Sequence, residues 1–397
     1  MKPTVKIVSL LLAVMMLFTA IASGCSIGKE WSYKANDKEL SIGVYIYALY
    51  NAYNRAQGFA EKLDDYDSTS DSWLDKEITD DDGNTAVART WIKEQAQTLC
   101  LEIFAVESEL KRLGATADEA MLENMISAAE SNWNFGTTYT QYIGYVTPLS
   151  KTLEPYGVSY DSFKEVTAVF AANQEALFKA LYFEGGEKEV SKDELKKYFD
   201  ENYVKYAYLP VALNEATTDE AGESKNVALS DDKIKTITDA LDGIAKEVND
   251  QADSVKAAET SESQISKYIT DNGMEESALV TNTAVRNETN VGEEIDKAIA
   301  ELGEGKATTV KVGEGDSATY YYVFRYNTET AEADYLTPGT NDETIISKMK
   351  EKDFTNYLKE LAGKVDYDKN NAVDGYDPKM FFVPKEPETT AAAKEEE

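Results

Sequence analysis

The sequence predicts an α+β protein with a helical first half and a compact α+β unit in its second half. Between residues 39 and 182, apolar residues recur at spacings of three and four, the period of helices that bury one face. Runs of β-branched and aromatic residues, which favour strands, stand out at Tyr203–Val211, Thr308–Val312 and Thr319–Tyr326. A chain of 397 residues, 42% hydrophobic and 28% charged, is long enough for more than one core.

Local signals set the ends of the helices in the first half. Gly114 follows a long amphipathic pattern, and glycine commonly ends a helix in the left-handed conformation. A polar, aspartate-rich loop is expected from Asp64 to Asn84. Helices are expected over residues 39–60, from Trp91 to Leu113, after Thr116–Glu119, and between Gly157 and Tyr182.

The second half opens at Ser191–Glu194, which has the pattern of a capping box, in which serine and glutamate side chains satisfy free backbone N–H groups. The elements that follow have the order β-α-α-α-β-β, and the two outer strands are expected to be adjacent. The expected helices of this unit are Asp231–Val248, Glu262–Ile269 and Glu293–Leu302.

The N-terminus has the pattern of a secretory signal. Met1–Lys6 is short and basic, and the apolar run Ile7–Ile21 is shorter than the roughly 20 residues that a membrane-spanning helix needs. The run ends in Ala22–Cys25, which resembles the lipobox of bacterial lipoproteins, where the cysteine takes lipid and becomes the first mature residue. We expect residues 1–24 to be removed and Cys25 to anchor the protein at the extracytoplasmic face of the cell membrane. An ordinary secretory cleavage site is the alternative.

Composition excludes several classes of function. The chain has no histidine, so Ser-His-Asp and Cys-His catalysis and histidine-ligated zinc are excluded. A net charge of -33 repels phosphate backbones, so nucleic acid is not an expected partner. Cys100 lies among apolar residues at helical spacing and is expected to be buried.

No cofactor and no metal is expected. Two acidic segments are candidates for calcium loops. Asp80–Asn84 lacks the alternating ligands and distant glutamate of such a loop. Asp366 to Asp377 fits the odd ligand positions better, but Asn371 replaces the turn glycine and Asp377 the bidentate glutamate. Asp80–Asn84 is interpreted as a solvated loop, and calcium binding at Asp366 to Asp377 stays an open alternative.

Two segments carry a resemblance to a known family. Glu189–Tyr203 is similar to the linker helix that leads into a parvulin-type peptidyl-prolyl isomerase domain, and Ala298–Gly305 is similar to that domain's last helix and turn. The chain thus resembles the PrsA/SurA foldases, extracytoplasmic chaperones in which a helical body carries an inserted parvulin domain. The resemblance implies that a helix at Asn341–Val365 returns to complete the body.

The sequence signals and the resemblance together divide the chain into six expected parts. These are residues 1–24 (signal peptide), 25–190 (helical chaperone domain like the SurA/PrsA N-terminal domain), 191–203 (linker helix), 204–328 (parvulin-like domain), 329–380 (returning helix) and 381–397 (disordered acidic tail).

The two histidines that shape the pocket of active parvulins are replaced. By position, their places are taken by Tyr208 and Tyr322. Two phenols that hydrogen-bond each other could retain weak isomerase activity, because prolyl rotation needs no nucleophile. The favoured interpretation is a plain cross-strand aromatic pair, with isomerase activity weak or lost. An active isomerase stays as the alternative.

The expected partners are unfolded or exported polypeptides. Aromatic residues bind such clients through large contacts at low cost in entropy. The client-binding candidates are Tyr45, Tyr50, Tyr53, Trp133, Phe135, Tyr139 and Tyr142, each with core packing as the alternative. A solute-binding lipoprotein and a structural envelope lipoprotein remain open as other classes.

Overall fold

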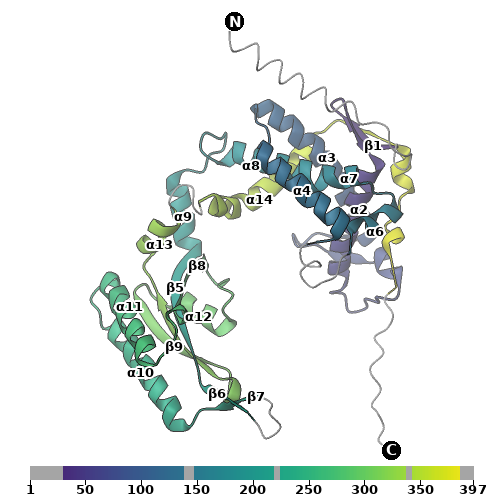
Figure 1. Ribbon diagram of the computed structural model, residues 1–397. Helices are drawn as coiled ribbons and strands as arrows, with labels where there is room; N and C mark the ends of the chain where they lie inside the picture. Colours follow the sequence, from purple (N-terminus) through teal and green to yellow (C-terminus); the bar gives the residue numbers. More distant parts are fainter. Residues whose placement is uncertain (1–29, 138–146, 219–223, 337–341, 385–397) are drawn as a thin grey trace, which may run out of the picture. The chain divides into compact units, whose positions relative to one another are not determined.

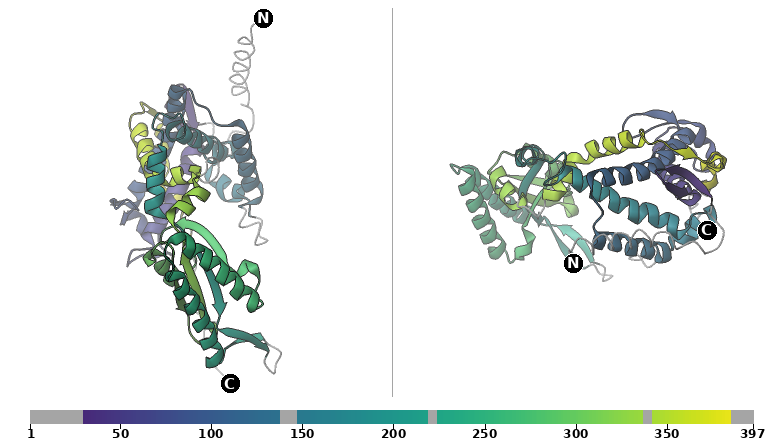
Figure 2. Two further views of the ribbon diagram at one scale, coloured as in Figure 1. Left: turned by 90° about the vertical axis from the view of Figure 1, so that its left-hand side faces the viewer. Right: turned by 90° about the horizontal axis from the view of Figure 1, so that it is seen from above.

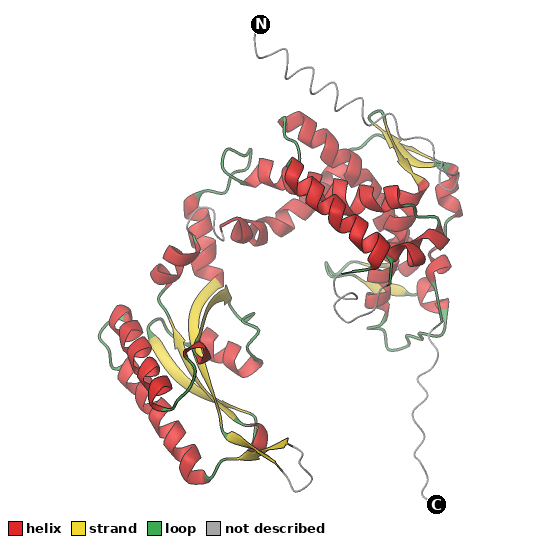
Figure 3. Cartoon of the chain, in the orientation of Figure 1, coloured by secondary structure: helices red, strands yellow, loops and turns green. Residues whose placement is uncertain are grey.

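The protein folds into two units that together confirm the α+β class. The computed structural model describes residues 30–137, 147–218, 224–336 and 342–384 (Figure 1). It is 59% helical and 17% strand, with the strands in several small sheets (Figure 3). The first unit consists of Met1–Leu181 and Lys352–Glu397, and the second of Tyr182–Glu351. The chain therefore leaves the first unit once and returns to it.

Helices dominate the first unit. Its helices and helical turns are α2 (Ile42–Ala60), η1 (Asp71–Asp75), α3 (Ala88–Leu113), α4 (Glu119–Phe135), α6 (Leu149–Leu153), η2 (Glu154–Tyr156), α7 (Tyr160–Lys164), the π-helical η3 (Glu165–Phe170), α8 (Ala171–Tyr182), η6 (Asn371–Gly375), η7 (Pro378–Phe381) and the end of α14 (Asp342–Ala362). The expected helix boundaries hold where a capping residue marks them. Gly114 ends α3 with a φ of 67°, and the Asp118 carboxylate accepts from the Met121 N–H at the start of α4.

The expectation that the first half is helical throughout is wrong. β1 (Trp31–Ala35) lies between β2 (Lys38–Ser41) and β11 (Asp368–Lys369) in a three-stranded sheet. β3 (Glu77–Thr79) lies inside the segment expected to be a loop and forms a hairpin with β4 (Thr85–Val87), which directly follows that segment. These strands are two to five residues long, too short for a periodic pattern, and Tyr33 pairs with the distant Lys369.

The second unit is built on an antiparallel sheet of four strands in the order β8-β5-β10-β9. The outer expected strands, now β5 and β10, are adjacent as predicted. The elements are α9 (Lys192–Asn202), β5 (Tyr203–Ala212), β6 (Asn214–Thr218), β7 (Ser224–Ala228), α10 (Asp231–Asn249), α11 (Ser254–Asp271), η4 (Glu276–Ala278), β8 (Val280–Val285), α12 (Glu293–Glu301), β9 (Lys306–Val312), η5 (Gly315–Ser317), β10 (Thr319–Arg325), α13 (Thr328–Tyr335) and the start of α14.

Sequence patterns located most of this unit and missed three strands. The capping box at Ser191 and Glu194 is formed as expected, and α10 has nearly the expected limits. β8 was missed because its residues are mostly small or polar. β6 and β7 form a separate ribbon that extends past the end of the four-stranded sheet (Figure 2). The observed order is therefore β-β-β-α-α-β-α-β-β.

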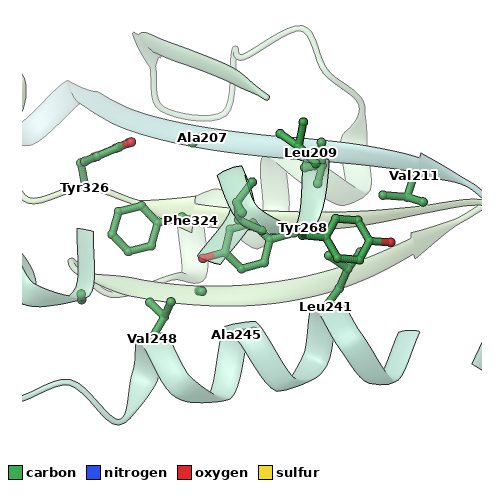
Figure 4. Close-up of a cluster of buried hydrophobic side chains, with 14 residues drawn as sticks. Ala207, Leu209, Val211, Leu241, Ala245, Val248, Tyr268, Phe324 and Tyr326 are labelled. Carbon is green, nitrogen blue, oxygen red and sulfur yellow. The ribbon is translucent and has the colours of Figure 1, made fainter. Parts of the chain in front are cut away.

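Helices cover the two faces of this sheet unequally. On one face, α10 and α11 enclose a large core in which Leu241, Ala245 and Val248 point from α10 toward the strands (Figure 4). On the other face, the short α12 contributes Ile295 and Ile299 to a smaller cluster. At roughly 25 cal/mol per Å² of apolar surface removed from water, the first face stabilises the unit most. The second face keeps half-buried apolar residues at its surface.

Candidate functional site

The register of β5 and β10 separates Tyr208 from Tyr322. Tyr208 lies opposite Val323, and Tyr322 lies opposite Leu209. Directly opposed residues of an antiparallel pair share a face, and successive residues alternate between faces. The two tyrosines therefore point to opposite sides of the sheet. The expected cross-strand pair is wrong, and their hydroxyls do not meet.

Tyr322 belongs to the core beneath α10 and α11. Its side chain is 0% exposed, and its hydroxyl shares a buried hydrogen bond of 2.7 Å with the Ser261 hydroxyl. Burial raises the pKa of Tyr322, and the Ser261 hydrogen bond opposes that rise. A phenol that is neutral, fully enclosed and already hydrogen-bonded has a structural role.

Tyr208 lies on the other face, where its aromatic neighbours are Tyr206 and Tyr321. The ring centroids of Tyr208 and Tyr206 are 6.2 Å apart with planes at 19°, and those of Tyr208 and Tyr321 are 6.2 Å apart at 42°. Tyr206 is buried, its hydroxyl donates to the Thr289 carbonyl at 3.4 Å, and burial raises its pKa. The tyrosine of β10 that accompanies Tyr208 is thus Tyr321, one residue before the expected position.

A group of half-buried residues surrounds this pair. Tyr321 lies opposite Pro210 on β5 and Val310 on β9. We name the group the open floor; its members are Tyr208, Pro210, Val310, Val312 and Tyr321. The fully buried part of the same face, with Val323 and the α12 residue Ile299, supports the floor from one end. The floor is therefore apolar, partly wetted and backed by a packed sheet.

The chemistry that the open floor offers is contact and hydrogen bonding. Among the residues that the structure describes, the Tyr208 and Tyr321 hydroxyls form no hydrogen bond with the protein. They can donate to a carbonyl group laid across the floor. Tyr321 was missed by sequence reasoning because three tyrosines stand in a row at 320–322, and only the strand register decides which of them faces outward.

Three of the five expected client-binding aromatics that the structure describes are buried in the first unit. Tyr45, Tyr53 and Trp133 are 2%, 4% and 6% exposed, so they are core residues of the first unit and not a client surface. Tyr50 is half-buried, with Phe381 and Tyr156 as ring neighbours. Of the candidates that the structure describes, Phe135 remains at the surface, with 56% exposure. Tyr139, Tyr142 and Cys25 lie outside the described residues.

Acidic side chains in the two candidate calcium segments have partners within the protein. The Asp80 carboxylate accepts from the Asn84 N–H at 2.8 Å and from the Trp91 indole at 3.3 Å. Asp374 pairs with Lys369, and Asp377 pairs with Arg89. In the described part of the chain, no group of three or more acidic, cysteine or histidine side chains is placed to hold a metal ion.

The described helices include none that is both long and apolar enough to cross a membrane. This finding concerns residues 30–137, 147–218, 224–336 and 342–384 alone.

Comparisons with known proteins find similarity among solved structures only. No protein-family model matches the sequence, and no curated protein matches it. The foldase PrsA from Streptococcus pneumoniae is 16% identical, with a TM-score of 0.35 over 78% of this chain and 100% of that one. PrsA from Bacillus subtilis is 14% identical, with a TM-score of 0.28 over 74% of this chain and 94% of that one.

Proposed function

We propose that the protein is a lipid-anchored extracytoplasmic chaperone that holds unfolded segments of exported polypeptides on the open floor. The observation that carries the proposal is the unequal covering of the four-stranded sheet. One face is closed by two helices, whereas the other leaves Tyr208 and Tyr321 half-buried above a fixed sheet. Unfolded chains supply the apolar side chains and carbonyl groups that such a floor can contact.

The floor suits weak and sequence-tolerant binding. Tyrosine combines a large apolar ring with a hydroxyl and has only two side-chain torsions to fix, so little entropy is lost on contact. Pro210 and the two valines add apolar surface without any charge that a client would have to pair. Release is then favourable once the client has a core of its own, because folding removes its apolar segments from the floor.

Catalysis of prolyl isomerisation is not part of the proposal. Rotation about a peptide bond has a barrier of roughly 18–20 kcal/mol, and lowering it requires groups held against the twisting bond. The two tyrosines at the histidine positions face opposite sides of the sheet, so they cannot form a joint pocket. The proposed binding of peptide therefore does not involve a joint pocket of the two residues at the histidine positions, which the family resemblance implies for active members.

The place of action is proposed from the N-terminal sequence. The apolar run and the small residues before Cys25 support export and lipid attachment, which would hold the chaperone where exported chains emerge. The high negative charge keeps the protein soluble while it handles apolar clients. Solute-binding and structural lipoproteins remain alternative classes.

Two assays on the chain that starts at Ser26 test this function. Light scattering measures suppression of aggregation of a chemically unfolded model protein, and a protease-free peptide assay measures prolyl isomerisation. We expect suppression at near-equimolar concentration and no catalysis. Catalysis would revive the isomerase alternative. The absence of both activities would favour a solute-binding or structural lipoprotein.

A further inference from the structure

The chain enters the first unit through a strand that is fixed on both sides. In β1, Trp31 pairs with Ser41 of β2, and the Ser32 carbonyl accepts from the Asn370 N–H at 2.9 Å. The Ser32 side chain is 0% exposed, and its hydroxyl lies 3.0 Å from the Ser41 carbonyl. Directly before the strand, the Glu30 carbonyl accepts from the Ile42 N–H at 2.7 Å. From Glu30 onward the backbone is therefore held by hydrogen bonds.

Little chain separates this strand from the lipid anchor of the proposed function, on which the inference rests. Only Ser26–Glu30 stand between Cys25 and Trp31. An extended chain advances by at most about 3.6 Å per residue, so Trp31 stays within about 22 Å of the lipidated cysteine. The end of the first unit where β1 begins is thus held beside the bilayer surface.

Trp31 differs from the other tryptophans of the chain. Trp73, Trp91 and Trp133 are 1%, 4% and 6% exposed, whereas Trp31 is only half-buried. The Lys34 ammonium lies 4.2 Å from the centroid of its ring and 2.6 Å from a Glu39 carboxylate oxygen. Tryptophan and lysine are the residue types that settle at a membrane interface, with an apolar body inward and a polar group toward the headgroups.

We propose that the surface formed by Trp31 and Lys34 lies in contact with the headgroup layer of the bilayer that carries the acyl chains of Cys25. The indole enters the layer below the phosphates, and the Lys34 ammonium exchanges Glu39 for a lipid phosphate. The chain carries a net charge of -33, so an anionic membrane repels most of its surface and contact is confined to this tethered end.

Fluorescence quenching tests the contact. The mature chain starting at Cys25 is coupled through that thiol to a maleimide phospholipid; Cys100, the other cysteine, is 0% exposed and does not compete. The conjugate is placed on vesicles of phosphatidylglycerol and phosphatidylethanolamine that contain a lipid with a nitroxide on its headgroup. The emission of Trp31 is taken as the difference between the wild-type chain and Trp31→Phe.

The expected result is at least a twofold loss of Trp31 emission on nitroxide vesicles, with unchanged emission from the three other tryptophans. A variant with twenty glycine and serine residues inserted after Ser26 should regain the emission, because its tether no longer holds the strand at the surface. The proposal is overturned if the conjugate floats with the vesicles while Trp31 is quenched no more than in the extended variant.

A separate measurement keeps the anchor and the contact apart. Mass spectrometry of the chain purified from cell membranes shows whether Cys25 carries lipid. A chain without lipid would remove the anchor from the proposed function, whereas an unquenched conjugate would remove only the membrane contact.

Discussion

Tyr321 and Tyr322 are neighbours in the sequence but serve opposite faces of the sheet. Tyr322 is 0% exposed and bonded to Ser261, whereas Tyr321 is half-buried and its ring centroid lies 6.2 Å from that of Tyr208. Truncating Tyr322 should lower the stability of the unit, whereas truncating Tyr321 should weaken the binding of clients. This difference separates the structural part of the account from the functional part.

The buried hydrogen bond between Ser261 and Tyr322 predicts a non-additive pair of substitutions. Tyr322→Phe leaves the Ser261 hydroxyl buried without its partner, which typically costs about 1–3 kcal/mol. Tyr322→Phe combined with Ser261→Ala should be less destabilised than the sum of the two single variants, because no unsatisfied group remains. Urea unfolding of all four proteins measures the coupling free energy. Strict additivity would contradict the buried bond.

Substituting alanine for each of two glycines of α2 should change the stability of the protein in opposite directions. A Cβ at Gly43 would overlap the Ser162 hydroxyl and lie 3.2 Å from the Gly157 carbonyl oxygen, whereas one at Gly58 meets nothing within 4 Å. Gly43→Ala should destabilise by about 1–3 kcal/mol through overpacking. Gly58→Ala should stabilise by roughly 0.5–1 kcal/mol through helix propensity. Thermal unfolding of both variants tests this prediction. An equal shift of the melting temperature in the same direction for both variants would contradict the packing of α2 on α7.

Glu102 of α3 should make the first unit less stable as pH rises. Burial raises its pKa to about 7, against the opposing charge of Lys359. A folded-state pKa above the unfolded value means that protonation favours the folded state. Its contribution is complete below about pH 4.5 and is lost as pH rises to about 7.

The substitution Glu102→Gln tests this by removing the titration. The variant should melt at a higher temperature than the wild type at about pH 8, where the wild-type carboxylate is charged, and at nearly the same temperature at about pH 4.5. Differential scanning calorimetry across this range gives the comparison. A melting difference that does not grow with pH would show that Glu102 titrates normally.

Local signals predicted the helices well because caps and periodicity act over a few residues. Gly114 and Ser191 each mark an end that the structure keeps, and α4 begins within the expected segment Thr116–Glu119. Two of the missed strands depend on partners far away in the chain. β11 pairs with β1 across more than three hundred residues, and β8 is recognisable only through its pairing with β5.

The same limit applies to the candidate site. Tyr208 lies on the strand that the sequence predicts, but the partner expected for it faces the other side of the sheet. A shift of one residue in register moves every side chain of a strand to the other side. Tyr45 and Tyr53 are core residues for a different reason: composition alone does not separate core tyrosines from exposed aromatics such as Phe135.

The most direct test of the account measures binding of an unfolded polypeptide to the open floor. A fluorescent, permanently unfolded protein is titrated separately with three proteins. They are the chain that starts at Ser26, its double variant Tyr208→Ser and Tyr321→Ser, and its single variant Val255→Ser. Val255 is the control because it is 58% exposed and apolar but lies on α11, on the other side of the sheet.

Loss of two aromatic contacts is expected to cost on the order of 2 kcal/mol, about a 30-fold rise in Kd. The account predicts that rise for the double variant, with an unchanged Kd for Val255→Ser and unchanged far-UV circular dichroism for both. Equal affinity of the double variant and the wild type would contradict the proposal that the open floor holds clients.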